Sequence, residues 1–159
     1  MFDNGLAISP VTWIDEGVLS ALAQTRWTAG LSGQPSTPET DNLILEGAGT
    51  NGASLDEMIA GTRRALLVTS LWYVREVDPQ TLLLTGLTRD GVYLVENGEV
   101  TGAVNNFRFN ESPVGLLGRL AEVGATVPAL ARERRDFTRS AMPPARFADF
   151  NMSSVSQAS

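Results

Sequence analysis

The stretch Gly61–Gly98 constrains the fold of this chain most, because it holds apolar runs of strand length separated by turn residues. Ala65–Tyr73 is rich in Leu, Val, Trp and Tyr, the residue types that suit a pleated, half-buried surface. Asp78-Pro79-Gln80 interrupts this run, since Pro fixes its own backbone and biases the preceding residue away from helix. A second apolar run, Thr81–Leu87, follows. The pattern predicts a meander of antiparallel strands.

Two dipeptides in this stretch are typical of hairpin turns. Arg89-Asp90-Gly91 contains Asp-Gly, and Glu96-Asn97-Gly98-Glu99 contains Asn-Gly. Both dipeptides tolerate the positive φ angles that tight two-residue turns require. We therefore expect a turn at each, with Val92–Val95 as a third strand between them.

The order of these segments resembles the C-terminal domain of the TldD/PmbA (TldD/TldE) metallopeptidase family. Members typically show a "G-LLVT" strand, a Gly- or Asp-rich bend, an "ENGE" hairpin, a following Val, and a helix that ends in "VG". The corresponding parts here are Ala65–Thr69, Thr88–Gly91, Val92–Glu99, Val104 and Pro113–Gly124. The resemblance extends from about Phe2 to Phe150.

The resemblance implies a heterodimer in which only one kind of subunit is catalytic. That subunit carries an HExxxH helix, which supplies two His ligands and a Glu base, and a Cys as the third zinc ligand. Three protein ligands hold the metal and leave one position for the attacking water. The present chain has no His and no Cys. The resemblance therefore implies a non-catalytic TldE-type subunit, without catalytic or metal-binding residues and without a cofactor. Zinc is expected only in a TldD-like catalytic partner.

Length and composition favour one β-rich domain over residues 1–159, with a flexible tail at about 153–159. We expect the α+β class, with antiparallel sheets that form a sandwich or barrel and a few short helices. The family's N-terminal α/β half has no counterpart in the sequence, so we expect either a truncated fragment or a short paralogue.

Charge and hydropathy exclude several classes of function. The net charge of −6 argues against a nucleic-acid-binding surface. No apolar run is long enough to span a membrane as a helix. The N-terminus lacks the basic and apolar parts of a secretion signal, which favours a cytoplasmic protein.

Several further elements follow from local signals. Ser54 and Glu57 match a capping box, and the helix they start should end near Gly61 in a left-handed cap. Ser112-Pro113 should start another helix, which ends at Gly124. The other expected elements are a strand at Phe2–Ile8, a hairpin over Val11–Ala23, a helix at Gln24–Gly33 that carries Trp27 inward, and strands at Asn42–Glu46 and Phe147–Met152.

Two pairs of side chains other than His and Cys are candidates for catalysis or metal binding. Glu76 and Asp78 are two residues apart, so on a regular strand they share a face. They are either solvated residues beside a turn or a carboxylate site, which would serve acid–base chemistry or bind a hard cation. Thr69 and Ser70 have no evident base, which gives nucleophilic catalysis little support.

Trp72 and Tyr73 are the candidate interface or peptide-binding residues. Adjacent strand residues point to opposite faces, so one ring should be buried and the other should need cover. Trp and Tyr are common anchors of interfaces.

The resemblance predicts a subunit that supports peptide hydrolysis by an HExxxH-bearing partner. It implies a peptide substrate bound in an extended form, which suits addition of a strand to a free sheet edge. A homo-oligomer is also possible. The alternatives are a stand-alone protein- or peptide-binding or assembly module and an independent carboxylate-based hydrolase.

Overall fold

The computed structural model describes residues 5–38, 42–47, 52–130 and 139–156. The chain divides into two compact units, Met1–Asn42 and Leu43–Ser159, and each is described here by itself. The β-rich α+β class with antiparallel sheets and short helices is confirmed, and none of the sheets built by the described residues closes into a barrel. The single domain over residues 1–159 stays a prediction.

The first unit contains a minimal hairpin and one helix. Strands β1 (Ile14–Asp15) and β2 (Val18–Leu19) pair around Glu16-Gly17, as the sequence predicts. Helix α1 (Arg26–Ser32) begins at Thr25, whose hydroxyl accepts a hydrogen bond from the Thr28 amide (3.1 Å). This cap satisfies one of the free amides at the start of the helix.

Two expectations for the first unit are wrong. Residues 5–8 form no strand, and the remainder of the strand predicted at Phe2–Ile8 lies outside the described residues. Trp27 does not point inward, because 73% of its surface is exposed. The helix has only seven residues and buries Ala29 alone, so it offers no core that could cover an indole.

The first helix of the second unit is α2 (Leu55–Ala60), which carries the predicted capping box at its start. The Ser54 hydroxyl accepts from the Glu57 amide (3.2 Å), and the Glu57 carboxylate accepts from the Ser54 amide (2.8 Å). Gly61 ends the helix at φ −80°, so the predicted left-handed cap is wrong. The Gly61 amide still bonds the Glu57 carbonyl, which closes the last turn.

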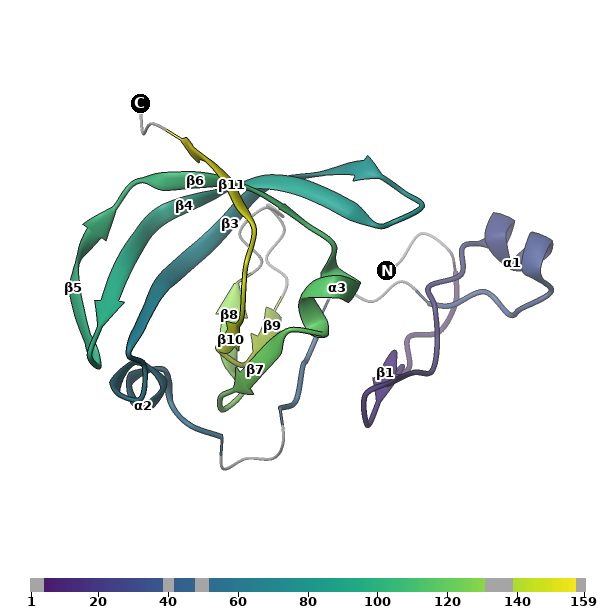
Figure 1. Ribbon diagram of the computed structural model, residues 1–159. Helices are drawn as coiled ribbons and strands as arrows, with labels where there is room; N and C mark the ends of the chain where they lie inside the picture. The colour runs from purple at the N-terminus through teal and green to yellow at the C-terminus, as the bar shows by residue number, and fades with distance from the viewer. Residues whose placement is uncertain (1–4, 39–41, 48–51, 131–138, 157–159) are drawn as a thin grey trace. The chain divides into compact units, whose positions relative to one another are not determined.

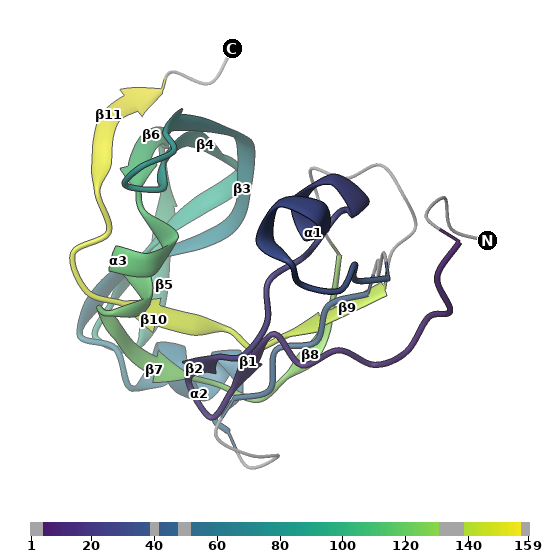
Figure 2. The same ribbon diagram turned by 90° about the vertical axis from the view of Figure 1, so that its right-hand side faces the viewer.

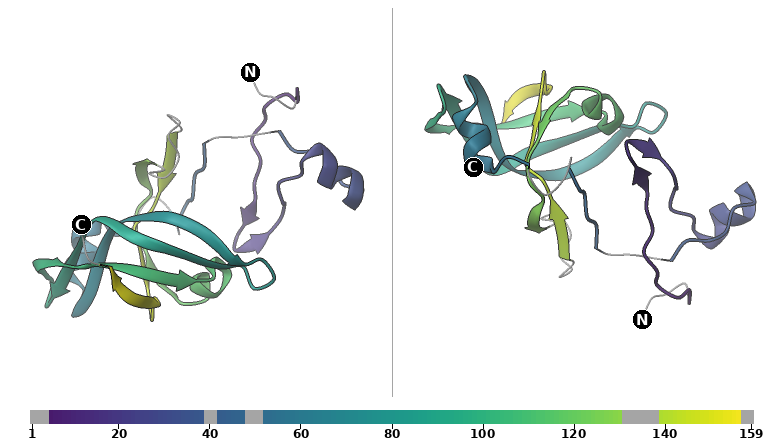
Figure 3. Two further views of the ribbon diagram at one scale, coloured as in Figure 1. Left: turned by 90° about the horizontal axis from the view of Figure 1, so that it is seen from above. Right: turned by 90° about the horizontal axis from the view of Figure 1, so that it is seen from below.

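A five-stranded antiparallel sheet dominates this unit (Figure 1). Strand β4 (Leu83–Glu96) lies at its centre and pairs with three neighbours, β3 (Arg64–Asp78), β5 (Glu99–Val104) and β6 (Asn106–Glu111). Strand β11 (Met152–Ser156) adds to the outer side of β6. Seen from above, β3 and β4 run side by side as one long twisted hairpin (Figure 3).

The long hairpin breaks at Asp78-Pro79-Gln80 as predicted, but it differs from the predicted meander at Arg89-Asp90-Gly91. The chain reverses between Asp78 and Leu83, not at Arg89-Asp90-Gly91. Strand β4 continues through Asp90 and Gly91, which have φ angles of 61° and 121°, and the register slips there between Val68 and Ser70 of β3. The Asp-Gly pair therefore forms a bulge, because the same positive φ angles serve an extra residue within a ladder as well as a turn.

The second predicted turn is confirmed. Glu96 pairs with Glu99, and Asn97 and Gly98 between them have φ angles of 52° and 86°. Positive φ at both central residues is the requirement of a type I′ turn. The Asn97 and Gly98 amides also donate to the carbonyls of Arg63 and Thr62. The turn is thus tied to the segment between α2 and β3.

Two small sheets and one helix complete the unit (Figure 2). Strand β7 (Leu120–Val123) pairs with β10 (Ala145–Phe147), and β8 (Val127–Leu130) pairs with β9 (Arg139–Met142). Helix α3 (Pro113–Leu117) starts at Ser112 as predicted, but it ends at Gly118 and not at Gly124, because the chain beyond it joins β7. The strand predicted at Phe147–Met152 is wrong, since a connection occupies most of that range. Asn42–Glu46 forms only a single bridge, between Ile44 and Ala141.

A partly buried ion pair joins the segment between α3 and β7 to the sheet. Glu111 on β6 is only 7% exposed and accepts from Arg119 (2.5 Å) and from the Asn151 amide (2.6 Å). Arg119 also donates to the Asp149 carbonyl. Beside this pair, Phe109 packs edge-on against Phe150 with ring centres 5.5 Å apart. The Phe109 ring also occupies the space that a side chain at Gly86 would need. Glu111 thus fixes β6 against the segment that leads into β11. The predicted start of the flexible tail, at about residue 153, lies within β11.

Candidate functional site

The outer edge of β3 is the candidate site, because β3 pairs only with β4 among the described residues. Its outer side therefore presents backbone N–H and C=O groups without a neighbouring strand. Residues 65–74 of this edge carry no charge, and Arg63, Arg64 and Arg75 flank them. Proteins usually interrupt exposed edges with charges, proline or short strands. A ten-residue uncharged edge is the kind of surface to which an extended peptide adds.

Trp72 and Tyr73 lie near the middle of β3 and are not covered as predicted. Trp72 is half-buried, and Tyr73 is 50% exposed. Tyr73 has a φ of 53°, and the register slips between Trp72 and Arg75. The expectation of one fully buried ring is wrong, because β3 bulges at this point and lies at the edge of the sheet. Their role in an interface or in peptide binding stays a prediction.

The bulge in β4 is locked from β3 by Thr69. Its hydroxyl lies 2.8 Å from the Gly91 carbonyl and 3.3 Å from the Arg89 carbonyl, both on the bulged segment. Extra residues in a bulge lose their ladder partners, and a side-chain donor can replace them. Thr69 is thus explained as a structural residue, which agrees with the small support for it as a nucleophile.

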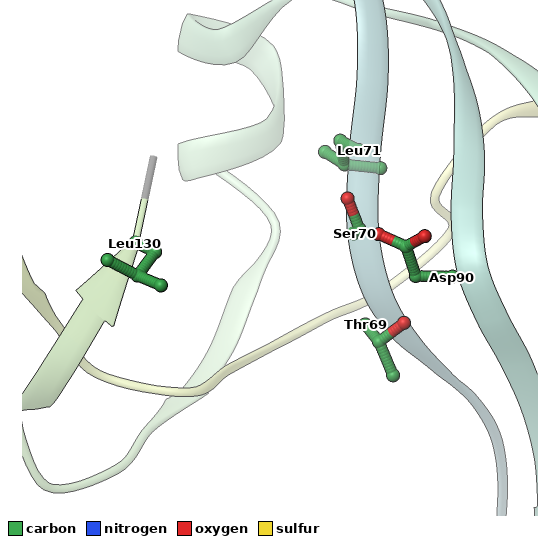
Figure 4. Close-up of a pocket in the computed structure, with 5 residues that line it drawn as sticks. All are labelled: Thr69, Ser70, Leu71, Asp90 and Leu130. Carbon is green, nitrogen blue, oxygen red and sulfur yellow. The ribbon is translucent and has the colours of Figure 1, made fainter. Parts of the chain in front are cut away.

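A shallow pocket of about 400 Å³ lies beside this bulge. Figure 4 shows Asp90 and Ser70 next to each other, with Leu130 of β8 across the pocket. Thr69 and Leu71 complete the lining. The Ser70 hydroxyl is buried and has no hydrogen-bond partner among the described residues. Sequence reasoning could not place Ser70 and Asp90 in one pocket, because the register of the bulged ladder decides which residues lie side by side.

The carboxylate pair on β3 does not form a shared site. Glu76 lies opposite Leu84, and Asp78 lies opposite Leu83. Leu83 and Leu84 are neighbours on β4 and point to opposite faces, so the two carboxylates do as well. The prediction of a shared face is wrong because the register slips between Glu76 and Asp78.

Asp78 has a structural role at the end of the hairpin. The Thr81 hydroxyl (2.7 Å) and the Gln80 amide (3.0 Å) both donate to its carboxylate. These hydrogen bonds, the Thr81 bond first, lower the pKa of Asp78 because they favour its charged form. The reading as a turn residue is therefore the one that the contacts support.

The residues present do not fit a zinc site of the kind that the resemblance describes. The chain has neither the imidazoles nor the thiolates that bind zinc most often. Within the described ranges, no three acidic side chains come close enough together to hold a metal ion. No helix among these residues is long and apolar enough to cross a membrane.

The fold and this edge define a β-rich domain that offers a sheet edge but no zinc-ligand set. The family model described as the PmbA/TldA metallopeptidase C-terminal domain matches residues 1–154. The chain therefore belongs to this family, and the resemblance seen in the sequence is confirmed. No curated protein matches it.

Two solved structures share the fold. TldE from Thermococcus kodakarensis is 20% identical with a TM-score of 0.65, and the match covers 88% of this chain and 32% of that one. A putative modulator of DNA gyrase from Bacteroides thetaiotaomicron is 21% identical with a TM-score of 0.67, covering 95% and 32%. The chain thus spans about a third of the length of these proteins.

Proposed function

We propose that this chain is a non-catalytic subunit, or part of one, in a peptide-processing complex whose zinc site lies on a TldD-like partner. The observation that carries the proposal is family membership combined with the absence of His and Cys from the chain. A member that cannot build the metal site can still position the substrate or the partner. The likeness to a protein named TldE supports the non-catalytic assignment.

The free edge of β3 supplies the binding surface in this proposal. A peptide in extended form would pair with residues 65–72, the part of β3 that precedes its own bulge at Tyr73. Its main chain would supply affinity, and alternate side chains would face the two sides of the sheet. The half-exposed Tyr73 would contact either the peptide or the partner. We place the complex in the cytoplasm, the compartment that the sequence favours.

The test is reconstitution with an HExxxH-bearing subunit from the same source. We expect the two chains to co-elute on gel filtration and to hydrolyse an unfolded peptide in a chelator-sensitive reaction, whereas this chain alone does not. Trp72→Ala and Tyr73→Ala should weaken assembly or raise KM. Val100→Ala, an exposed apolar residue on β5, is the matched control.

The outcomes separate the proposal from its alternatives. If the chain binds peptides at the β3 edge but no HExxxH-bearing subunit associates with it, a stand-alone binding module is correct. Chelator-resistant hydrolysis by the pure chain would instead revive a hydrolase without zinc.

A further inference from the structure

A closed loop in the first unit carries helix α1. Residues 24–37 form this α1 loop, and its two ends are hydrogen-bonded to each other. The Thr37 amide donates to the Gln24 carbonyl (2.9 Å), and the Gln24 amide donates to the Thr37 hydroxyl (2.9 Å). Compact loops whose ends are held together are frequently functional. The base of the α1 loop is thus fixed by hydrogen bonds of its own.

Helix α1 presents two large apolar side chains to solvent. Trp27 and Leu31 are four residues apart, so they lie next to each other on one face of the helix. They are 73% and 70% exposed, whereas Ala29 on the opposite face is buried. The Gly33 amide bonds the Ala29 carbonyl (2.9 Å) and closes the last turn. Because the helix is capped at both ends, it displays this apolar pair from an ordered support.

The first unit has no core of its own that could cover these side chains. Among its described residues, only Ala29 is buried. A folded segment of about 40 residues usually needs a disulfide, a metal or association with another chain. The chain has no Cys for a disulfide and neither His nor Cys for a structural metal, so association is the route that its composition leaves open. Besides Trp27 and Leu31, five apolar side chains of the unit are at least half exposed: Ile8, Ile14, Val18, Leu19 and Leu22.

A pocket of about 390 Å³ lies within the same unit, where the end of β2 meets the far end of the α1 loop. Its apolar lining comes from Leu19, Ala21, Leu22 and Pro35, and its polar lining comes from Ser20, Gln24, Gln34 and Thr37. An indole combines an apolar body with a single N–H donor, which suits apolar walls with amide oxygens among them. Sites for small ligands begin at about 300 Å³, so the pocket has room for one aromatic side chain.

We propose that the first unit binds a second copy of this chain, with Trp27 of each copy seated in the pocket beside Leu22 of the other. The same unit carries both the exposed ring and the pocket, so its surface is complementary to itself, as a symmetric pair requires. Helix α1 lies apart from β1 and β2 within the unit (Figures 1 and 2), so ring and pocket are available at the same time. Neither the β3 edge nor a zinc-bearing partner enters this inference, which goes beyond the proposed function.

The exposed area explains which side chain should matter most. At its exposure, the Trp27 ring supplies about a fifth of the roughly 800 Å² that each partner of a specific interface buries. The exposed aliphatic side chains of the unit must supply most of the remainder, and the proposal places them around the ring. Interfaces depend on a few aromatic anchors near their centre. We therefore expect a steep loss of affinity at Trp27 and smaller losses at the aliphatic positions.

Sedimentation velocity on the full chain over a range of concentrations tests the inference. Wild type should show a monomer–dimer equilibrium. Trp27→Ala should weaken the dimer about 100-fold, because it empties two pockets worth about tenfold each, and Leu31→Ala should weaken it less. Leu130→Ala is the matched control and should dimerise as wild type does, since Leu130 on β8 is 85% exposed and lies outside the first unit.

A mixing experiment separates a ring-and-pocket contact from a general effect on folding. Leu22→Glu places a charge in the pocket, so it should weaken the dimer as Trp27→Ala does. When these two variants are mixed, the intact ring of the first meets the intact pocket of the second, and one of the two contacts is restored. The mixture should therefore form heterodimers about tenfold more tightly than either variant forms homodimers.

The possible results either support the inference or overturn it. A wild type that stays monomeric at the highest concentration, equal dimerisation of wild type and Trp27→Ala, or no recovery in the mixture overturns it. So does an HExxxH-bearing subunit that binds wild type but not Trp27→Ala while this chain alone is a monomer, since that subunit is then the occupant of the surface. A dimer with the expected losses, in a chain that binds no such subunit, supports this inference and counts only against the proposed function.

Discussion

The guanidinium of Arg75 stacks on the ring of Tyr73, two residues earlier on the same strand, at 4.2 Å from the ring centre. On a regular strand, residues two apart point the same way and lie about 6.6 Å apart, a distance that an arginine side chain can span. Here the contact spans a bulge, because Tyr73 adopts a φ of 53° and the register slips between Trp72 and Arg75. At this bulge in the edge strand, the tyrosine is half-exposed and the arginine covers one side of its ring.

Substitutions at Tyr73 should separate backbone strain from the loss of the ring. Tyr73→Asn keeps a residue that tolerates positive φ, so it should lose only the ring contacts, whereas Tyr73→Val should lose about 1–3 kcal/mol more through strain. Urea unfolding of the two variants measures this difference. Equal stabilities would show that the left-handed conformation at residue 73 is not required.

The geometry of the Asn97-Gly98 turn predicts that a small substitution at Gly98 lowers the stability of the protein. A Cβ at Gly98 would lie 2.7 Å from the Ala60 carbonyl oxygen, and φ there is 86°. Gly98→Ala should therefore destabilise the protein by about 1–3 kcal/mol. Gly102→Ala on β5 is the control, since its Cβ would meet nothing within 4 Å. Similar melting temperatures for the two variants would contradict the turn geometry.

The buried Glu111 should contribute more to stability than any exposed ion pair. Glu111→Ala leaves Arg119 and the Asn151 amide without their acceptor, so the free energy of unfolding should fall by about 2–4 kcal/mol. Glu96→Ala, which removes the exposed pair with Arg64, should cost about 0–1 kcal/mol. The double variant Glu111→Leu/Arg119→Met should be more stable than Glu111→Ala. The opposite order would show that the carboxylate contributes little.

The capping box predicts that its contribution to the stability of the folded state is lost in acid. The Ser54 amide and then the Ser54 hydroxyl lower the pKa of Glu57, because both donate hydrogen bonds to its charged form. A carboxylate with a lowered pKa in the folded state stabilises that state above its unfolded pKa, and this contribution is lost as pH falls through the folded pKa. The melting temperature of wild type should therefore exceed that of Glu57→Gln at pH 7, and the gap should close in acid. A gap that does not change with pH would contradict this role.

The isolated chain should retain no stoichiometric zinc after dialysis, because its sequence lacks the ligands that bind zinc tightly. Metal analysis by mass spectrometry checks this directly. A subunit with an HExxxH helix, treated in the same way, is the control that should keep its metal.

Local signals in the sequence determined the elements whose geometry is set within a few residues. The Ser54–Glu57 capping box and the Asn97-Gly98 turn form as predicted, since a hydroxyl three residues from an amide and two residues with positive φ need no distant partner. The missing His and Cys were equally plain in the sequence, and the proposal of a non-catalytic family member rests on them. The order of the strand motifs was enough to identify the family.

Tertiary structure decided which residues share a face. Asp90-Gly91 has the composition of a turn, yet pairing of β4 with β3 on both sides of it makes it a bulge. The slip between Glu76 and Asp78 then places these two carboxylates on opposite faces. A bulge changes the two-residue alternation from which faces are predicted, and its position depends on hydrogen bonds between segments that lie about twenty residues apart. The separation of Glu76 from Asp78 therefore could not be predicted from the sequence, although both carboxylates were visible there.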